Sequence, residues 1–416
     1  MCDAREYGQI CSSEQEKSMK ICLLTANFIT GRGYQENHWA DVSLALGHEL
    51  LIVTTDLKHK DLQNEISDKD MYGEGLVRLK AVRLPFNIVR IKRGLIYSLL
   101  DEFAPELILL IGYTQYFGLD AFRYKRKMND RTKLVVFNGE CADMHRYWRV
   151  HRNLRIKDLI KSIGWRFLRG PVIKAAVGRA DSVICATPDT EAIIKTVFSD
   201  RGTESNNGKL LYCPLSYDGS KMFYNDSLRE QTRATFGIRD KDVLLLASTR
   251  IRADKLRYYL RPMVEGVARF IKGRDYLRFV LVGFTDEAVS SKFKVEVELL
   301  FGRKGLVTLP IADQDYLNAL YNAADIVIFS TVSNSIQQAM GSGAYILLSD
   351  NVGRNYIINE KDQGMYFNLR EPGSLERCIE EAVKCYRNIS RPERAKMNSW
   401  LESKTLYGSL LERLKE

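Results

Sequence analysis

The sequence predicts an α/β protein built from two doubly wound, Rossmann-like domains. Short apolar runs fit for buried parallel strands recur along the whole chain, with helical stretches between them. The chain also opens with a strand, a glycine loop, a helix and a second strand, which is a βαβ unit. A comparable series of strands then starts again in the second half. A length of 416 residues agrees with about two to three domains.

The first βαβ unit defines the start of the N-terminal half. Residues 20–28 predict a strand, residues 29–33 a loop with two glycines, and residues 34–46 a helix. Gly47 ends this helix, because a left-handed C-cap needs a residue without a β-carbon. Residues 49–54 predict the second strand. Further strands are expected at 107–111, 134–137 and 182–186.

The C-terminal half repeats the same alternation after a Ser-Asn-Asn-Gly turn signal in the segment 205–214. We expect ligand between the two domains, outside the carboxyl ends of their strands. Strands are predicted near Val243, Phe279, Leu306, Ile326, Tyr345 and Met365. The predicted organisation is a flexible tail at 1–18, an N-terminal domain at 19–210, a C-terminal domain at 211–390 and a C-terminal helix at 391–416.

Composition excludes several classes of protein. No apolar run reaches the roughly 18 residues that a membrane span needs, and the first 18 residues lack the apolar core of a signal peptide. The eight cysteines form no Cys-x-x-Cys pair, which favours reduced thiols in a cytoplasmic protein over a disulfide framework or a zinc site. The net charge of +10 comes without a zinc-finger or RNA-binding signature. An anionic donor or anionic lipid is therefore the better partner than nucleic acid.

Two segments of the second half suit a diphosphate. The strand near Val243 is followed by Ser-Thr-Arg-Ile-Arg-Ala-Asp-Lys, which places Arg250 and Lys255 five residues apart. The strand near Ile326 is followed by a small polar loop and a helix, where backbone N–H groups face outward. The candidate phosphate ligands in that loop are Ser333, Asn334 and Ser335. The alternative is that the two cations are plain surface charges and that the loop only caps its helix.

This order of parts resembles the donor-binding half of retaining glycosyltransferases of family 4, which have the GT-B fold. The resemblance implies transfer of a sugar from a nucleotide-diphosphate donor to a glycan or lipid-linked acceptor, with retention, in polysaccharide biosynthesis. It implies that Arg250 and Lys255 grip the diphosphate and that Leu309, Pro310 and Ile311 hold the base. It also implies a last helix that crosses back onto the first domain. No cofactor beyond the donor is expected, and the lack of an Asp-x-Asp motif in the expected place fits metal independence.

The sequence departs from the family pattern at its acidic motif. The family usually has two glutamates separated by seven residues, the second followed by Ala-Met. Here Ala339-Met340 is preceded by Gln338, and Ser330 stands at the position of the first glutamate. A Gln338 amide can still bond a ribose hydroxyl, as donor and as acceptor. Leu256 also replaces the usual glycine after the lysine. These departures leave the donor sugar open.

The N-terminal half offers its own candidates. The loop of Gly31, Arg32 and Gly33 follows the first strand and is expected to contact donor phosphate or acceptor, unless it is only a tight turn. Glu140 and His145 follow the strand at 134–137 and could bind or orient an acceptor hydroxyl. The alternative for these two residues is a polar surface loop.

A basic stretch with interleaved aromatic residues covers residues 146–169. Such a helix can lie on an anionic bilayer, which would make the protein peripheral at the inner face of the membrane. The alternative is an ordinary amphipathic helix packed on its own sheet.

Two other functions stay open on the sequence. A degenerate transferase could act as a non-catalytic binding partner or scaffold, which the missing glutamates favour. A nucleotide-sugar epimerase on the same fold would need acids and histidines at the cleft, and the missing acidic pair disfavours it.

Overall fold

The computed structural model describes most of the chain. The described residues are 18–31, 33–57, 72–84, 88–112, 116–138, 156–199, 209–302, 305–331, 333–350 and 357–415. The predicted tail at 1–18 therefore lies outside the described residues except for Ser18.

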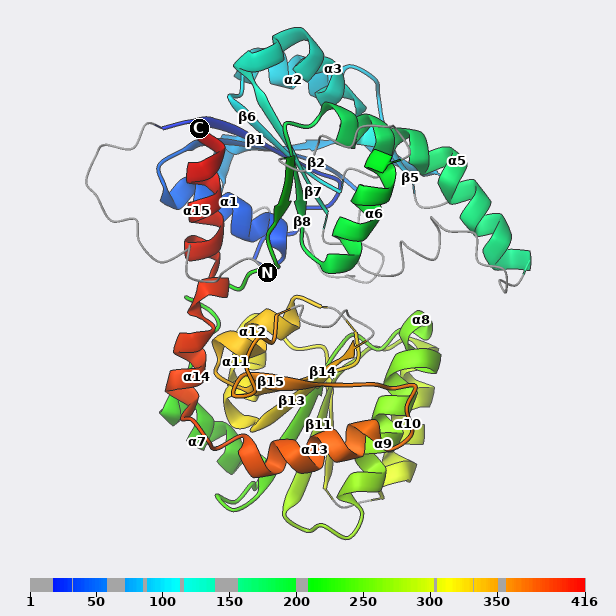
Figure 1. Ribbon diagram of the computed structural model, residues 1–416, viewed down its shortest axis with the longest axis vertical. Helices are drawn as coiled ribbons and strands as arrows, with labels where there is room; N and C mark the ends of the chain where they lie inside the picture. Colours follow the sequence, from blue (N-terminus) through cyan, green and yellow to red (C-terminus); the bar gives the residue numbers. More distant parts are fainter. Residues whose placement is uncertain are drawn as a thin grey trace. The chain divides into compact units, whose positions relative to one another are not determined.

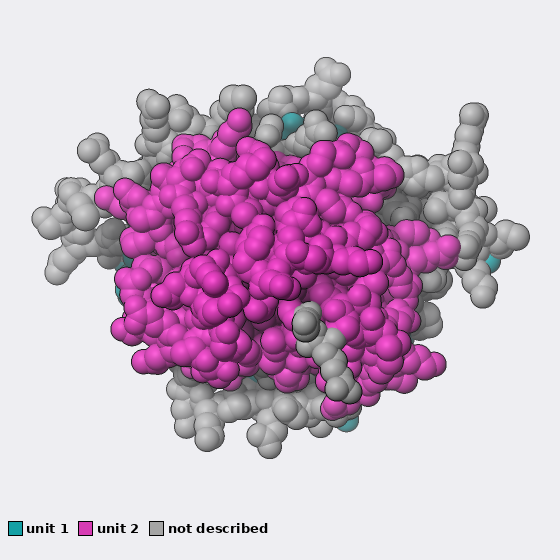
Figure 2. Space-filling model, turned by 90° about the horizontal axis from the view of Figure 1, so that it is seen from below, with its two compact units in different colours: residues 1–215, 406–416 teal, residues 216–405 magenta. Residues whose placement is uncertain are grey.

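The chain divides into two compact units. Unit 1 comprises Met1–Leu215 together with Leu406–Glu416, and unit 2 comprises Ser216–Thr405. Figure 2 shows unit 2 from below, where its atoms form one continuous body.

Unit 1 is built on a seven-stranded parallel sheet in the order β3-β2-β1-β6-β7-β8-β9. A short antiparallel hairpin of β4 and β5 accompanies it. The strands are β1 (Lys20–Thr25), β2 (Glu49–Thr55), β3 (Leu76–Leu79), β4 (Ala81–Leu84), β5 (Ile88–Ile91), β6 (Leu107–Ile111), β7 (Lys133–Asn138), β8 (Ser182–Cys185) and β9 (Leu210–Tyr212).

Helices cover this sheet because its strands are apolar on both faces (Figure 1). Alternate β1 residues, Cys22 and Leu24, enter a core with buried side chains of α2, α3 and α5, while Ile21 and Leu23 point to the opposite face, as the period of two requires. The helices are α1 (Gln35–Ala45), α2 (Leu95–Phe103), α3 (Leu119–Met128), α5 (Ile156–Arg179) and α6 (Pro188–Ser199).

The C-terminal segment is shared between the units. In unit 2, α14 (Arg391–Met397) is fixed by Arg391, whose guanidinium donates to the carbonyls of Tyr321 (2.8 Å) and Ser342 (3.0 Å). The last helix, α15 (Ser403–Lys415), packs on unit 1 from Leu406 onward. There Tyr407 stacks on Trp39 of α1 with ring centroids 4.0 Å apart. The expected return of the last helix to the first domain is thus present.

Unit 2 contains a six-stranded parallel sheet in the order β12-β11-β10-β13-β14-β15. Its strands are β10 (Val243–Ser248), β11 (Leu277–Phe284), β12 (Leu306–Pro310), β13 (Ile326–Phe329), β14 (Tyr345–Ser349) and β15 (Gly364–Phe367). Its remaining helices are α7 (Asp226–Thr235), α8 (Ala253–Lys255), the π-helical turn η7 (Leu256–Leu260), α9 (Arg261–Ile271), α10 (Ala288–Phe301), α11 (Gln314–Ala323), α12 (Ser335–Gly341) and α13 (Ser374–Cys385).

Two cores lie on the two faces of this sheet. Leu245 and Ala247 of β10 join buried residues of α9, α10 and α13, whereas Leu244 and Leu246 join those of α11 and α12. The predicted α/β class with two doubly wound sheets is therefore confirmed. The described part of the chain contains no helix that is both long and apolar enough to span a membrane.

Candidate functional site

The switch point of the unit 2 sheet lies between β10 and β13. These strands are parallel neighbours, with Leu245 opposite Ile326, but β10 leads on to β11 on one side and β13 leads on to β14 on the other. The loops that leave their carboxyl ends diverge, and this is where open α/β sheets bind ligands. The residues that follow the two strands are Thr249 and Arg250 after β10, and Ser330 and Thr331 after β13.

A small hollow, too narrow to admit a water molecule, lies at this switch point. Its lining includes Ser248 and Thr249 from the β10 side and Ser330, Thr331 and Ser333 from the β13 side. Met263 of α9 contributes an apolar wall. Residues that carry hydroxyls, from both loops, therefore line one hollow. Two of the predicted ligands, Ser330 and Ser333, belong to this set.

Lys255 returns from α8 to the end of β10. Its Nζ donates to Thr249 Oγ1 at 3.3 Å, and Thr249 lines the hollow. Arg250 directly follows Thr249 and is half-buried. The five-residue spacing thus places the ammonium of Lys255 over the residue that precedes Arg250. Two basic residues, Arg250 and Lys255, thus follow the carboxyl end of a central strand, which is where a diphosphate would need them.

Gly283 of β11 fixes the path of this turn. Its φ is +121°, and a β-carbon there would come within 1.9 Å of the Thr249 carbonyl oxygen. The Ile251 N–H donates to the Gly283 carbonyl at 3.0 Å. Because only glycine tolerates both the conformation and the approach, Gly283 determines where the backbone of Thr249 and Arg250 lies.

Leu256 stands where the resemblance implies a glycine. The structure places Leu256 at the start of the π-helical turn η7, with its side chain buried in the core on the α9 face of the sheet. Leu256 is not among the residues that line the hollow. Single π-turns often occur at functional sites, because they shift a helix by one residue. Here the shift follows directly after Lys255.

Tyr321 of α11 supports the floor of the site. Its hydroxyl hydrogen-bonds the Ser248 hydroxyl at 2.6 Å, in the protein interior. Burial raises the pKa of Tyr321 to about 12, so the phenol stays protonated at neutral pH. This side chain thereby ties the end of β10 to α11.

The polar loop before α12 serves partly as a cap. The Ser335 N–H donates to Ser333 Oγ at 3.1 Å, whereas the Asn334 side chain makes no capping bond. Gln338 is 5% exposed and lies on the second turn of α12. Its neighbour Gln337 is fully buried, and neither of its amide atoms has a hydrogen-bond partner among the described residues. The two positions before Ala339 thus both carry neutral amide side chains.

The predicted base-binding segment lies at the end of β12. Leu309 and Pro310 are the last residues of this edge strand, and Ile311 follows it with 38% of its surface exposed. The Ile311 N–H donates to the Phe284 carbonyl of β11 at 3.1 Å. Residues 309–311 and Arg250 therefore both lie at the carboxyl ends of the strands, and β12 is two strands away from β10.

Unit 1 has a second switch point, between β1 and β6. The loop after β1 contains Gly31 and Gly33, both with positive φ (+73° and +63°). Four successive carbonyls of this loop, residues 26–29, each accept a hydrogen bond from a side chain, at distances of 2.7 to 3.2 Å. The donors are Thr55, Thr25, Arg78 and Asn37, in that order. The loop is therefore held in one shape by the elements around it.

Glu36 follows this loop in the first turn of α1. Burial raises the pKa of the Glu36 carboxyl to about 7. A carboxyl group that titrates near neutrality at a switch point can accept a proton or a hydrogen bond from a hydroxyl.

The predicted residues Arg32, Glu140 and His145 lie outside the described residues.

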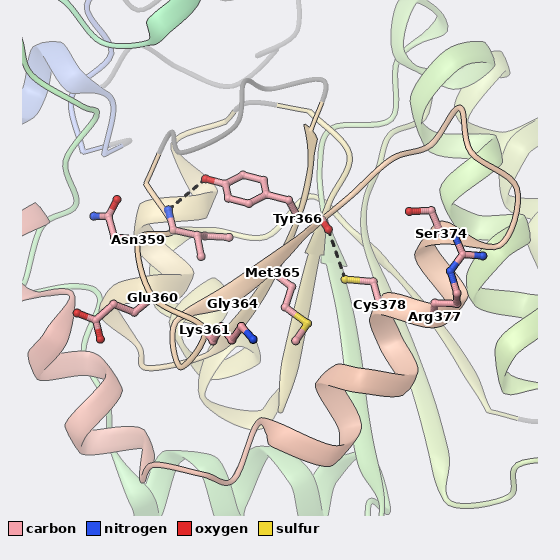
Figure 3. Close-up of a pocket in the computed structure, with 10 residues that line it drawn as sticks. Asn359, Glu360, Lys361, Gly364, Met365, Tyr366, Ser374, Arg377 and Cys378 are labelled. Atoms are coloured by element: carbon pink, nitrogen blue, oxygen red, sulfur yellow. Dashed lines mark hydrogen bonds between the residues drawn. The ribbon is translucent and has the colours of Figure 1, made fainter. Parts of the chain in front are cut away.

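A second hollow, of about 500 Å³, lies along the outer edge of β15. Figure 3 shows two hydrogen bonds among the residues that line it. The Tyr366 hydroxyl accepts from the backbone N–H of Ile358 at 3.3 Å, and the Tyr366 carbonyl accepts from the Cys378 thiol at 3.9 Å. Arg377 pairs with Glu371. This hollow lies at the edge of the sheet rather than at its switch point, so it is the weaker candidate.

Metal ligation finds no support in the part of the chain that the structure describes. No group of three or more His, Cys, Asp or Glu side chains there is arranged to hold a metal ion.

Three residues of the candidate site were not predicted from the sequence. Thr249 and Tyr321 are ordinary strand-end and helix residues in the sequence, and only the fold brings their hydroxyls to the switch point. Glu36 had a usable signal, because a carboxylate directly after a glycine loop lies in the first turn of the following helix. Its altered pKa depends on burial, which the sequence does not show.

Several solved structures have a fold similar to that of this chain. HepE of Anabaena in complex with UDP is 13% identical, with a TM-score of 0.66 over 95% of this chain and 100% of that one. Sucrose-phosphate synthase from Thermosynechococcus elongatus is 16% identical, with a TM-score of 0.63 over 95% and 98%. WaaG, a glycosyltransferase involved in lipopolysaccharide biosynthesis, is 14% identical, with a TM-score of 0.58 over 94% and 95%. At such identities the likeness shows the two-domain GT-B fold.

No protein-family model matches the chain, and no curated protein matches it either.

Proposed function

We propose that this protein is a glycosyltransferase that moves a sugar, of the hexosyl class, from a nucleotide-diphosphate donor to a glycan or lipid-linked acceptor. The observation that carries the proposal is the return of Lys255 to Thr249 at the switch point of unit 2, because Thr249 directly precedes Arg250 and lines one hollow with Ser330 and Ser333. The solved relative HepE binds UDP on the same fold, which supports a nucleotide-sugar donor.

The two cations would act on the leaving group. When the bond between the sugar C1 and the diphosphate oxygen breaks, negative charge grows on the diphosphate. Arg250 and Lys255 stabilise that charge, and fixed cations in this role contribute several kcal/mol. The hydroxyls and N–H groups of Ser333, Asn334 and Ser335 complete the phosphate site. Gln338 would bond the ribose, and residues 309–311 would hold the base through backbone groups.

Retention and metal independence belong to the same proposal. The acceptor oxygen bonds to C1 on the face that the diphosphate leaves, and the acceptor proton passes to the departing phosphate oxygen. This course needs no protein base, and the two cations take the charge-neutralising role of a metal ion. In unit 1, Gly31, Arg32, Gly33, Glu140 and His145 are proposed to contact the acceptor or the donor phosphate.

We place the enzyme in the cytoplasm, peripherally at the inner face of the membrane. The basic run 146–169 supports this placement, because it would bring a lipid-linked acceptor and an anionic surface together.

A donor panel tests the function. Purified protein is incubated with UDP-, GDP- and ADP-sugars, with and without glycan acceptors, and release of nucleoside diphosphate is measured alongside the fate of the sugar. Transfer or slow donor hydrolysis is the expected result. Binding without turnover would establish the scaffold instead, and an altered sugar that stays attached to its nucleotide would establish the epimerase.

A further inference from the structure

Helix α5 changes its surroundings along its length. In its C-terminal half, Ile173 and Val177 are fully buried in the core of unit 1. In its N-terminal half, Ile160, Ile163 and Phe167 are 58%, 42% and 75% exposed. Figure 1 shows this N-terminal half extending beyond the sheet of unit 1. Three large apolar side chains therefore face solvent on one projecting segment.

The exposed residues form a stripe on the side of the helix that faces away from the core. At about 100° per residue, Ile160, Ile163 and Phe167 fall within a sector of about 60°. The buried residues of the C-terminal half centre roughly 140° away around the axis. Core packing thus gives no reason for the stripe. Contiguous exposed apolar side chains of this kind mark interaction surfaces.

The sequence places basic residues at helix positions on both sides of the stripe. Lys157 and Arg166 occupy positions about 90° to either side of it, and Lys161 lies further round. Asp158 is the one acidic residue between 156 and 169.

The neighbouring helix α3 behaves differently, although its sequence is also basic. Lys125 pairs with Asp181 at 2.8 Å, and Lys127 pairs with Asp101 at 2.8 Å. The cations of α3 are thus largely neutralised within unit 1. In the sequence, residues 156–169 place four Lys or Arg against one Asp on the segment that also carries the apolar stripe.

We infer that the stripe of Ile160, Ile163 and Phe167 docks unit 1 on an anionic bilayer, with α5 lying along the surface. An apolar stripe between basic positions matches a lipid surface, where acyl chains lie beneath anionic headgroups. The stripe spans about 10 Å along the axis and is one side chain deep, which suits insertion of about 5–10 Å at the headgroup boundary. This inference goes beyond the charge of the run 146–169, because it assigns part of the binding to apolar contact that salt does not remove.

Vesicle sedimentation tests the inference. Full-length protein is mixed with vesicles of phosphatidylcholine that contain phosphatidylglycerol as the anionic lipid, and with pure phosphatidylcholine vesicles, at low and high salt. The variant Ile160→Ser/Ile163→Ser/Phe167→Ser removes the stripe. Thermal melting confirms that it folds. The matched control removes three apolar side chains of α10 that are 56%, 78% and 48% exposed, in the variant Val295→Ser/Leu299→Ser/Leu300→Ser.

The expected result is binding of the wild type to the anionic vesicles, partly retained at high salt. The stripe variant should bind at least about tenfold more weakly, while the α10 control binds like the wild type. Equal binding by the stripe variant and the wild type would overturn the inference. The inference would also be overturned if the wild type bound neither kind of vesicle. A wild-type dimer and a monomeric stripe variant would then show that the stripe is a dimer interface.

Discussion

The two switch points of this molecule share a topology and differ in chemistry. In unit 2 Lys255 donates to Thr249, which directly precedes Arg250 and lines one hollow together with Ser330 and Ser333 of the β13 loop. In unit 1 the loop after β1 has its carbonyls held by neighbouring side chains and is followed by Glu36, whose pKa is raised to about 7. Cations with hydroxyls suit a diphosphate, whereas a carboxyl group that is readily neutral suits the hydroxyls of a sugar. Under the proposed function, the switch point of unit 2 would hold the donor and that of unit 1 the acceptor.

The largest expected effect comes from the cation side of this comparison. Lys255→Ala should lower turnover about a hundredfold, because it removes one charge-assisted contact to the leaving diphosphate, worth about 3 kcal/mol. Steady-state release of nucleoside diphosphate measures it. Lys272→Ala serves as the control, since Lys272 is exposed at the far end of α9. A Lys255→Ala enzyme with the wild-type rate would remove Lys255 from the site.

Gly283→Ala tests how much the turn at Thr249 and Arg250 depends on backbone shape, without changing any charge. The new β-carbon would clash with the Thr249 carbonyl and would adopt an unfavourable φ, so we expect a loss of about 2–3 kcal/mol in unfolding free energy. Gly302→Ala is the matched control, because Gly302 has a φ of +66° but open space around its Cα. Urea unfolding compares the two. Equal losses would mean that the contact with Thr249 does not constrain the turn.

Glu36→Gln tests the acceptor edge through its pH dependence. The ordinary Glu pKa of 4.5 applies to the unfolded chain, and the folded value is about 7. Because the folded carboxyl resists ionisation, wild-type stability falls as the pH rises from about 4.5 to 7 and then levels off. The variant should therefore match the wild type at about pH 4 and exceed it by up to about 3 kcal/mol at about pH 8. Unfolding curves at the two pH values measure this, and a difference that is the same at both would refute the raised pKa.

Chelation should have the smallest effect. Activity is expected to persist in EDTA, because the two cations of the donor edge take over charge neutralisation. Complete loss of turnover in EDTA, restored by magnesium or manganese, would contradict this part of the proposal.

Local patterns predicted most of the fold. Apolar runs located the central strands, because a strand buried on both faces is apolar throughout. The β4–β5 hairpin and β3 were not predicted, since their half-exposed strands, such as Ala81–Leu84, mix charged and apolar residues. In the site, Arg250 and Lys255 could be predicted from their place after a strand. The contact with Thr249 and the burial of Leu256 could not, because both depend on the π-helical turn and on Gly283 of a neighbouring strand.

Calorimetric titration of UDP and GDP into the wild type, Lys255→Ala and Glu36→Gln tests whether the nucleotide binds at the switch point of unit 2 rather than at that of unit 1. We expect one of the two nucleotides to bind the wild type, Lys255→Ala to weaken this binding about tenfold or more, and Glu36→Gln to leave it unchanged. Unchanged binding in Lys255→Ala together with weakened binding in Glu36→Gln would contradict this division, and would move the nucleotide to unit 1.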